Sequence, residues 1–287
     1  MTGRPTSTFL EGLTFGEGPR WHGGRLWYSD FFHHAVWSVG LGPSPRPRRE
    51  AHVPGRPSGL GWLPDGRLLV VSMTDRRVLR REVDGTLATH AALDAWADCN
   101  ANDMLVDETG RAYVGHFGFD LDAFFEGCGT PAPASLLRVD PDGTVTEVAR
   151  DLRFPNGMVR FGQTLVVAET FGLRLSAFDV AADGALTDRR EWAALPGCAP
   201  DGTCGDAEGA VWVANALAPE CLRVAEGGTV LDRVVTSQPC FACALGGPDR
   251  RTLFCCTAPT SESDRLRDRT EGRIEVAPVS VPGAGLP

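Results

Sequence analysis

Apolar and polar positions follow one pattern that returns six times along the chain. Each time, a glycine-containing turn precedes a short apolar burst. The bursts occupy residues 26–30, 68–73, 112–117, 165–170, 211–216 and 253–258. Their first residues lie 42, 44, 53, 46 and 42 positions apart. A period of about 40–50 residues built from short strands is typical of a β-propeller, so the pattern predicts six blades.

A second strand signal and a tight turn follow most bursts. Asp-Gly pairs at 84–85, 142–143 and 183–184 stand between apolar segments, and this arrangement is a strong hairpin signal. The sequence therefore predicts an all-β fold, a six-bladed β-propeller with four-stranded blades, as a single domain over residues 1–287. Only residues 121–125 fit a short helical turn.

The first and last strands are expected to close the ring. Residues 8–14 precede the first unit, and residues 273–277 form a fair final strand. An open ring would leave sheet edges unpaired. We therefore expect these two segments to pair within the sixth blade.

Polar residues recur nine or ten positions before the bursts, where each innermost strand is expected to begin. These residues are Glu17, Ser58, Asn102, Asn156, Asp201 and Cys243. Because they occupy matching places in the repeat, we expect the six side chains to meet near the axis at one depth.

Four of these residues carry oxygen ligands of the kind that hard cations prefer: Glu17, Asn102, Asn156 and Asp201. Two carboxylates in a narrow channel would repel each other without a cation. The set favours one divalent metal ion, Ca²⁺ first, and is compatible with Zn²⁺, Mn²⁺ or Mg²⁺. The alternative is that Asn and Asp stand here simply because they are common in turns.

The charge of the chain argues against several functions. The net charge is −9 with no basic run beyond short arginine pairs, whereas nucleic-acid binding needs a clustered basic face. All 28 basic residues are arginines, which excludes a Schiff-base lysine and a phosphate-loop lysine. We expect a small-molecule substrate, no nucleic-acid or membrane partner, and a monomer or homodimer.

Hydropathy and cysteine content indicate the compartment. No apolar run approaches the roughly 20 residues of a membrane span, and the N-terminus shows no signal-peptide core, so we expect a cytoplasmic protein. The nine cysteines include one Cys-x-x-Cys pair, Cys240 and Cys243, without a second pair. We interpret them as buried, reduced thiols.

The motifs around the candidate ligands resemble the family of senescence marker protein 30, gluconolactonase and luciferin-regenerating enzyme. The segments that carry the resemblance are Glu17-Gly18-Pro19, Asn102-Asp103, Phe154-Pro155-Asn156-Gly157-Met158, Pro200-Asp201-Gly202 and residues 206–214. The resemblance implies a six-bladed propeller with one catalytic divalent metal. It further implies that Glu17, Asn156 and Asp201 are metal ligands, and that Asn102 lies at the metal and the substrate.

The chain departs from the sugar lactonases of that family near Asn102. Those relatives commonly have an arginine where this chain has Asn100, and an acid that contacts the substrate at roughly Asp120. The missing arginine argues against a sugar-acid lactone. Four aromatic residues favour a more apolar mouth, or serve as ordinary packing: Phe117, Phe119, Phe124 and Phe125.

The leading hypothesis is metal-assisted hydrolysis of a lactone or small cyclic ester. Asp201 would bind the metal and is a candidate general base, and Asn102 would act beside it. Substrate contacts are expected from Asn100, Asn102, His116 and Asp120. No Gly-x-Ser-x-Gly motif is present, which argues against a covalent serine mechanism.

Three other functions stay open at this point. The first is an organophosphate hydrolase, or an isomerase or lyase acting through a metal-held enolate. The second is a calcium-binding or scaffold propeller with a structural metal. The third is a protein-interaction propeller.

Overall fold

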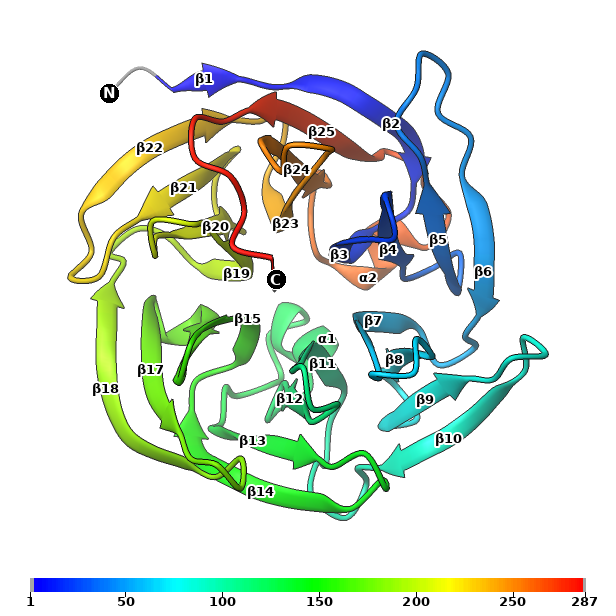
Figure 1. Ribbon diagram of the computed structural model, residues 1–287, viewed down its shortest axis with the longest axis vertical. Coiled ribbons are helices and arrows are strands. Elements are labelled where there is room, and N and C mark those ends of the chain that lie inside the picture. The colour runs from blue at the N-terminus through cyan, green and yellow to red at the C-terminus, as the bar shows by residue number, and fades with distance from the viewer. Residues whose placement is uncertain (1–2, 286–287) are drawn as a thin grey trace.

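The computed structural model describes residues 3–285, which form a ring of six β-sheets around a central axis (Figure 1). In each sheet the strand nearest the axis comes first in the repeat. Blade one contains β3 (Gly16–His22), β4 (Arg25–Asp30), β5 (Ala35–Val39) and β6 (Arg48–His52). Blade two contains β7 (Pro57–Trp62), β8 (Leu68–Ser72), β9 (Arg77–Arg81) and β10 (Leu87–Ala92). Blade three contains β11 (Ala101–Val106), β12 (Ala112–His116), β13 (Ala134–Val139) and β14 (Val145–Leu152).

The other three blades repeat this arrangement, so the predicted propeller is confirmed. Blade four contains β15 (Pro155–Phe161), β16 (Thr164–Glu169), β17 (Arg174–Val180) and β18 (Leu186–Ala194). Blade five contains β19 (Pro200–Gly205), β20 (Val211–Asn215), β21 (Glu220–Val224) and β22 (Val230–Val235). Blade six contains β23 (Cys240–Gly246), β24 (Thr252–Thr257), β25 (Gly272–Pro278) and the N-terminal strand β2 (Ser7–Leu13).

The N-terminal segment closes the ring as predicted. Strand β2 pairs antiparallel with β25, in a register that places Ser7 opposite Val276. The two-residue strand β1 (Arg4–Pro5) also pairs, in parallel, with β22 of blade five. The segment thus joins two neighbouring blades, and the sequence pattern did not predict this second pairing.

Each innermost strand carries an irregularity near its first residues. The register shifts between Glu17 and Arg20 in β3, and between Ala101 and Met104 in β11. Strands β15 and β19 show the same shift after their leading prolines. A β-bulge bends its strand and re-aims the side chains in it. The bulges therefore occur at the positions from which the candidate ligands project.

Glycines let the innermost strands approach one another at these bulges. A Cβ atom on Gly157 would lie 2.4 Å from the amide nitrogen of Thr203, and one on Gly59 would lie 2.3 Å from that of Met104. Backbone atoms cannot move aside as a flexible side chain does. The glycine after Asn156 is therefore required by close packing at the axis.

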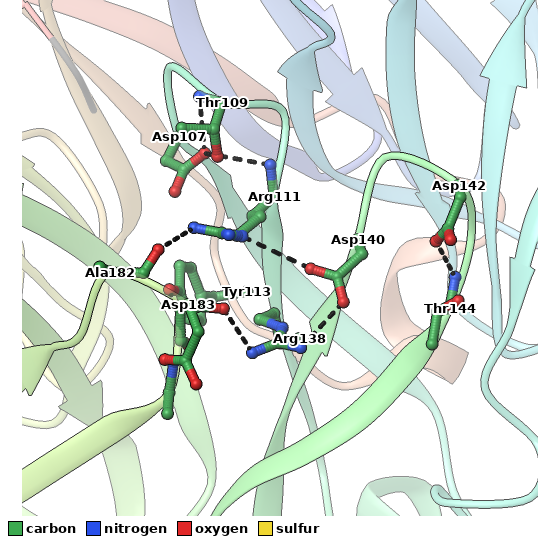
Figure 2. A network of polar contacts seen from close by, with 12 residues as sticks. Asp107, Thr109, Arg111, Tyr113, Arg138, Asp140, Asp142, Thr144, Ala182 and Asp183 are labelled. Carbon is green, nitrogen blue, oxygen red and sulfur yellow. Dashed lines mark hydrogen bonds and ion pairs between the residues drawn. The ribbon is translucent and has the colours of Figure 1, made fainter.

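Hairpin turns of blades three and four are held by aspartates and arginines. In Figure 2, Asp107 Oδ1 accepts hydrogen bonds from the amides of Thr109 and Arg111. Arg111 Nη1 donates to the carbonyl of Ala182 at 3.0 Å, and Arg138 Nη1 donates to that of Asp183 at 2.8 Å. These bonds connect blade three to a hairpin turn of blade four.

Helices are short. They are α1 (Leu121–Phe125), the 3₁₀ turn η1 (Thr170–Gly172) and α2 (Ser263–Leu266). Among residues 3–285, no helix has the length and apolar character to cross a membrane. The nine cysteines are free thiols, and seven of them are buried; the predicted burial is wrong for Cys99, which is half-buried, and for Cys128, which is exposed.

Candidate active site

The innermost strands bring the four predicted oxygen donors to one cavity of about 460 Å³. Glu17 comes from β3, Asn102 from β11, Asn156 from β15 and Asp201 from β19. Asn100, which precedes β11, lines the same cavity. Residues separated by more than 180 positions thus meet because the ring places the starts of its innermost strands around one axis.

The other two predicted ring residues, Ser58 and Cys243, do not line the cavity. Ser58 is buried but does not line the cavity, and the sixth position is occupied by Phe241 instead of Cys243. Five residues separate the paired Gly205 and Val211 in blade five, whereas seven separate the paired Leu245 and Leu253 in blade six. The burst of blade six begins at Leu253, and counting ten residues back from it gives Cys243. The residue that lines the cavity, Phe241, lies two positions earlier.

The two carboxylates share a buried, electrostatically unfavourable environment. Burial raises the pKa of Glu17 well above its ordinary value, and the charges of Asp201 and Asp103 raise it further. Burial also raises the pKa of Asp201, with the charge of Asp103 acting in the same direction. Within the described part of the chain, Asp201 Oδ1 is buried without a hydrogen-bond partner. This pair is suited to a positively charged ligand.

The two asparagines present their oxygens because their nitrogens are already bonded. Asn102 Nδ2 donates to the carbonyl of Pro155 at 3.2 Å. Asn156 Nδ2 donates to Thr170 Oγ1 at 3.2 Å, and that hydroxyl donates to the carbonyl of Pro200 at 2.8 Å. The amide oxygens are therefore the atoms left to bind a ligand.

Together these groups fit a hard divalent cation. Residues 3–285 contain no group of three or more His, Cys, Asp or Glu side chains suited to a metal ion. A cation in the cavity would accordingly depend on the amide oxygens of Asn102 and Asn156 as well as the two carboxylates. Oxygen donors of this mixed kind are typical of Ca²⁺ sites.

A buried ion pair that the sequence analysis missed lies next to this donor set. Arg20 Nη2 donates to Asp103 Oδ1 at 2.9 Å, and both side chains are almost fully buried. Arg20 also donates to the carbonyls of Leu60 and Met104. The arginine thus neutralises Asp103, which follows Asn102 directly in the chain.

His116 and Asp120 are not brought to the cavity. The Nε2 atom of His116 accepts a hydrogen bond from the amide of Ser135 at 3.0 Å, within a separate surface depression. Burial lowers the pKa of this imidazole. Asp120 caps α1 by accepting from the amide of Ala123 at 3.0 Å. Their positions lend no support to the substrate contacts that the sequence suggested.

One basic side chain lines the cavity, and the sequence analysis missed it. Arg56 has a φ of 62°, a left-handed backbone that non-glycine residues seldom adopt. Its guanidinium carbon lies 4.9 Å above the ring of Phe32. Phe154 precedes a proline as Arg56 does, and it has a φ of 61°. Strain of this kind often concentrates at functional sites.

Comparisons with known proteins match the chain to one sequence family and to two lactonases. The sequence model of the SMP-30/Gluconolactonase/LRE-like region matches residues 15–259. The chain is 31% identical to pentonolactonase XacC of Haloferax volcanii over 256 residues, covering 85% of this chain and 81% of that protein. It is 30% identical to 6-deoxy-6-sulfogluconolactonase of Pseudomonas putida over 196 residues, covering 65% of this chain and 64% of that protein.

A solved structure shares the fold. The calcium-binding protein regucalcin of Agrobacterium tumefaciens superimposes with a TM-score of 0.80 at 21% identity, covering the whole of this chain and 98% of that one. At this level of identity the likeness concerns the fold alone.

Proposed function

Because the chain belongs to the SMP-30/gluconolactonase/LRE-like family, we propose that it is a metal-dependent hydrolase that opens a lactone or a similar small cyclic ester. The observation that carries this proposal is the convergence of Glu17, Asn102, Asn156 and Asp201 in one cavity. The names of two relatives, a pentonolactonase and a sulfogluconolactonase, support the same reaction class.

A divalent cation would be held by Glu17, Asn156 and Asp201, with Asn102 completing the set. Ca²⁺ is the first candidate because carboxylate and amide oxygens are its usual ligands, and Zn²⁺, Mn²⁺ and Mg²⁺ remain compatible. When bound, the cation would polarise the lactone carbonyl and stabilise the negative charge that develops on its oxygen.

The protein side chains would position the reactants and move the proton. Asp201 Oδ1, buried and without a partner among the described residues, would accept a proton from the attacking water. The water oxygen bonds to the carbonyl carbon, the bond from that carbon to the ring oxygen breaks, and the ring oxygen takes up a proton. Asn100 and Asn102 would orient the substrate oxygens, and the product is a hydroxy acid.

The nine free cysteines support a reducing compartment. We therefore propose that the reaction takes place in the cytoplasm. Seven of these thiols are buried, and a reducing environment would keep them unpaired.

Acid release from a lactone panel tests the proposed function. The panel contains five- and six-membered lactones, both sugar-derived and alkyl-substituted, assayed before chelation, after it, and after addition of single divalent metals. We expect hydrolysis that stops with chelator, returns with one metal and is lost in Asp201→Asn. Failure to hydrolyse any lactone with any metal would contradict the proposal, and phosphotriesters and isomerisation would then be tested.

A further inference from the structure

Away from its four oxygen donors, the cavity is lined mainly by aromatic and aliphatic side chains. Nine of the chain's 14 phenylalanines line it. They are Phe15, Phe31, Phe32, Phe117, Phe124, Phe125, Phe154, Phe171 and Phe241. Binding sites place a few polar groups within apolar walls, and here the four oxygen donors lie near the starts of the innermost strands.

The first aromatic wall consists of Phe15, Phe31 and Phe241, from blades one and six. The ring of Phe15 lies with its centroid 5.0 Å from that of Phe31 and 4.8 Å from that of Phe241. Phe15 and Phe241 are buried, and Phe15 is two residues before Glu17 in the chain. This wall therefore begins directly beside one of the carboxylates.

The second aromatic wall consists of Phe117, Phe124, Phe154 and Phe171, from blades three and four. Phe117 stacks on Phe154 with centroids 4.5 Å apart, and Phe154 lies 5.4 Å from Phe171. Figure 1 shows β11 and β15 across the ring axis from β3 and β23. Both walls line the cavity that holds the oxygen donors.

Apolar side chains also surround the opening of the cavity. Phe125, Leu173 and Leu217 line it while remaining 43%, 38% and 67% exposed. Large apolar side chains that gather at the rim of a pocket, exposed to water, are a mark of ligand binding. The apolar character therefore extends from the walls to the entrance.

Besides the four oxygen donors, six polar residues line the cavity: Arg56, Asn100, Asp122, Thr170, Ser261 and Ser263. The guanidinium of Arg56 is stacked on Phe32 and its Nη1 donates to Ser263 Oγ at 3.5 Å. A sugar lactone carries hydroxyl groups on most ring carbons, and each one buried against phenylalanine would lose its hydrogen bonds to water. An alkyl or aryl group, in contrast, gains free energy by leaving water.

We propose that the substrate is a lactone that carries an alkyl or aryl substituent, held between the two aromatic walls while its carbonyl faces the oxygen donors. This inference rests on the proposed function for the reaction itself. The phenylalanines would contact the alkyl or aryl substituent. Glu17, Asn102, Asn156 and Asp201 would lie beside the reacting carbonyl group.

Kinetics on lactones of one ring size test the substituent directly. The substrates are δ-valerolactone, its pentyl- and phenyl-substituted derivatives and glucono-δ-lactone, with the uncatalysed rate subtracted. We expect kcat/KM to rise about fourfold for each fully buried methylene, and glucono-δ-lactone to fall below the unsubstituted ring. A kcat/KM for glucono-δ-lactone equal to or above that of the pentyl lactone would overturn the inference and leave the proposed function intact.

Two matched variants test whether the preference for a substituted lactone arises from the aromatic walls of the cavity. Phe171→Ala shortens the second aromatic wall, and Phe9→Ala removes another half-buried phenylalanine, which packs on Phe254 outside the cavity. We expect Phe171→Ala to reduce kcat/KM for the pentyl lactone about tenfold more than it reduces kcat/KM for the unsubstituted ring. Phe9→Ala should leave the ratio of the two substrates unchanged. Equal losses on both substrates in Phe171→Ala would overturn the assignment.

Binding of lactams separates the two proposals, because lactams keep the ring shape and resist hydrolysis. Calorimetry would compare a pentyl-substituted δ-lactam with its hydroxylated counterpart. Tighter binding of the pentyl lactam, with a negative heat-capacity change that weakens in Phe171→Ala, supports the apolar ligand class. That result without lactone turnover would contradict the hydrolase alone, whereas tighter binding of the hydroxylated lactam would overturn the inference alone.

Discussion

Arg20 and Asp103 form a buried ion pair, with the Nη2 and Oδ1 atoms 2.9 Å apart, between the innermost strands of blades one and three. Arg20 Nε also donates to the carbonyl of Leu60 in blade two at 3.1 Å. One side chain therefore joins three adjacent blades near the axis. Glu17 and Asn102 lie close to this pair in sequence, so its integrity bears on the positions of both.

Arg20→Met should strongly destabilise the protein. The substitution would leave Asp103 buried and uncompensated, and breaking such a pair costs about 3–5 kcal/mol. Denaturant unfolding measures the loss. The control is Arg190→Met, because Arg190 pairs with Asp179 where both side chains are well exposed, and such pairs contribute about 0–1 kcal/mol. Similar losses in the two variants would contradict the role of the buried pair.

Gly157→Ala should disturb the site through the backbone. The new Cβ would lie 2.4 Å from the amide nitrogen of Thr203 and 2.7 Å from the carbonyl oxygen of Asp201. Overpacking of this kind typically costs about 1–3 kcal/mol, and the displaced strand would carry Asp201 with it. Thermal unfolding and lactone turnover should both decline. Gly42→Ala is the control, since nothing lies within 4 Å of its Cβ position.

Much of the fold could be predicted because the information is local and repeated. In each unit, an apolar burst indicates a strand, and Asp-Gly turns indicate hairpins in several units. The closure by residues 8–14 follows from the need to pair every sheet edge. The pairing of β1 with β22 could not be predicted. It involves only Arg4 and Pro5, which carry no hydrophobic pattern of their own.

The site also contains residues that could be predicted from the sequence and residues that could not. Glu17, Asn102, Asn156 and Asp201 could be found because they stand in phase with the repeat, so one spacing rule locates them all. The rule failed at Cys243, since the first hairpin of blade six has one further pair, Gly246 with Thr252, and the count from Leu253 therefore ends two residues late. The aromatic walls and Arg56 come from loops, strand ends and an unusual φ, which depend on packing between blades and leave no period in the sequence.

Metal binding should stabilise the protein through the four oxygen donors. Saturation at 100 times the Kd adds about 2.7 kcal/mol to the free energy of unfolding, so Ca²⁺ should raise the Tm and chelator should lower it. Glu17→Gln removes one ligand charge and should abolish most of this shift. Ser58→Ala is the control, because Ser58 occupies the matching place in blade two and does not line the cavity. An unchanged Tm shift in Glu17→Gln would contradict the ligand assignment.

Removal of the N-terminal strand should open the ring. Deletion of residues 1–14 eliminates β2 and exposes the edge of β25, a ready template for association with other chains. We expect a lower Tm and aggregation measurable by light scattering. Deletion of residues 1–6 eliminates only β1 and should produce a much smaller loss, because β25 stays covered. Equal behaviour of the two deletions would contradict closure by β2.

His116 should make the stability of the protein depend on pH. Burial lowers the pKa of its imidazole in the folded state, whereas the unfolded value is about 6.5. As the pH falls through about 6.5, the unfolded chain binds a proton that the folded protein does not, so stability declines toward the folded pKa. The nearby charges of Asp98 and Glu147 oppose the shift but do not reverse it.

His116→Gln isolates this contribution because glutamine does not titrate. At pH 8 the variant should lose about 1–2 kcal/mol, since the hydrogen bond from Ser135 to the ring is replaced by a less favourable one. At pH 5.5 the difference in unfolding free energy between wild type and variant should shrink. Only the wild type loses stability there, because its imidazole binds a proton in the unfolded chain and stays neutral in the folded protein. Unfolding free energies at both pH values measure this change, and a constant difference would contradict it. Lactone turnover should persist in the variant, because His116 lies outside the cavity.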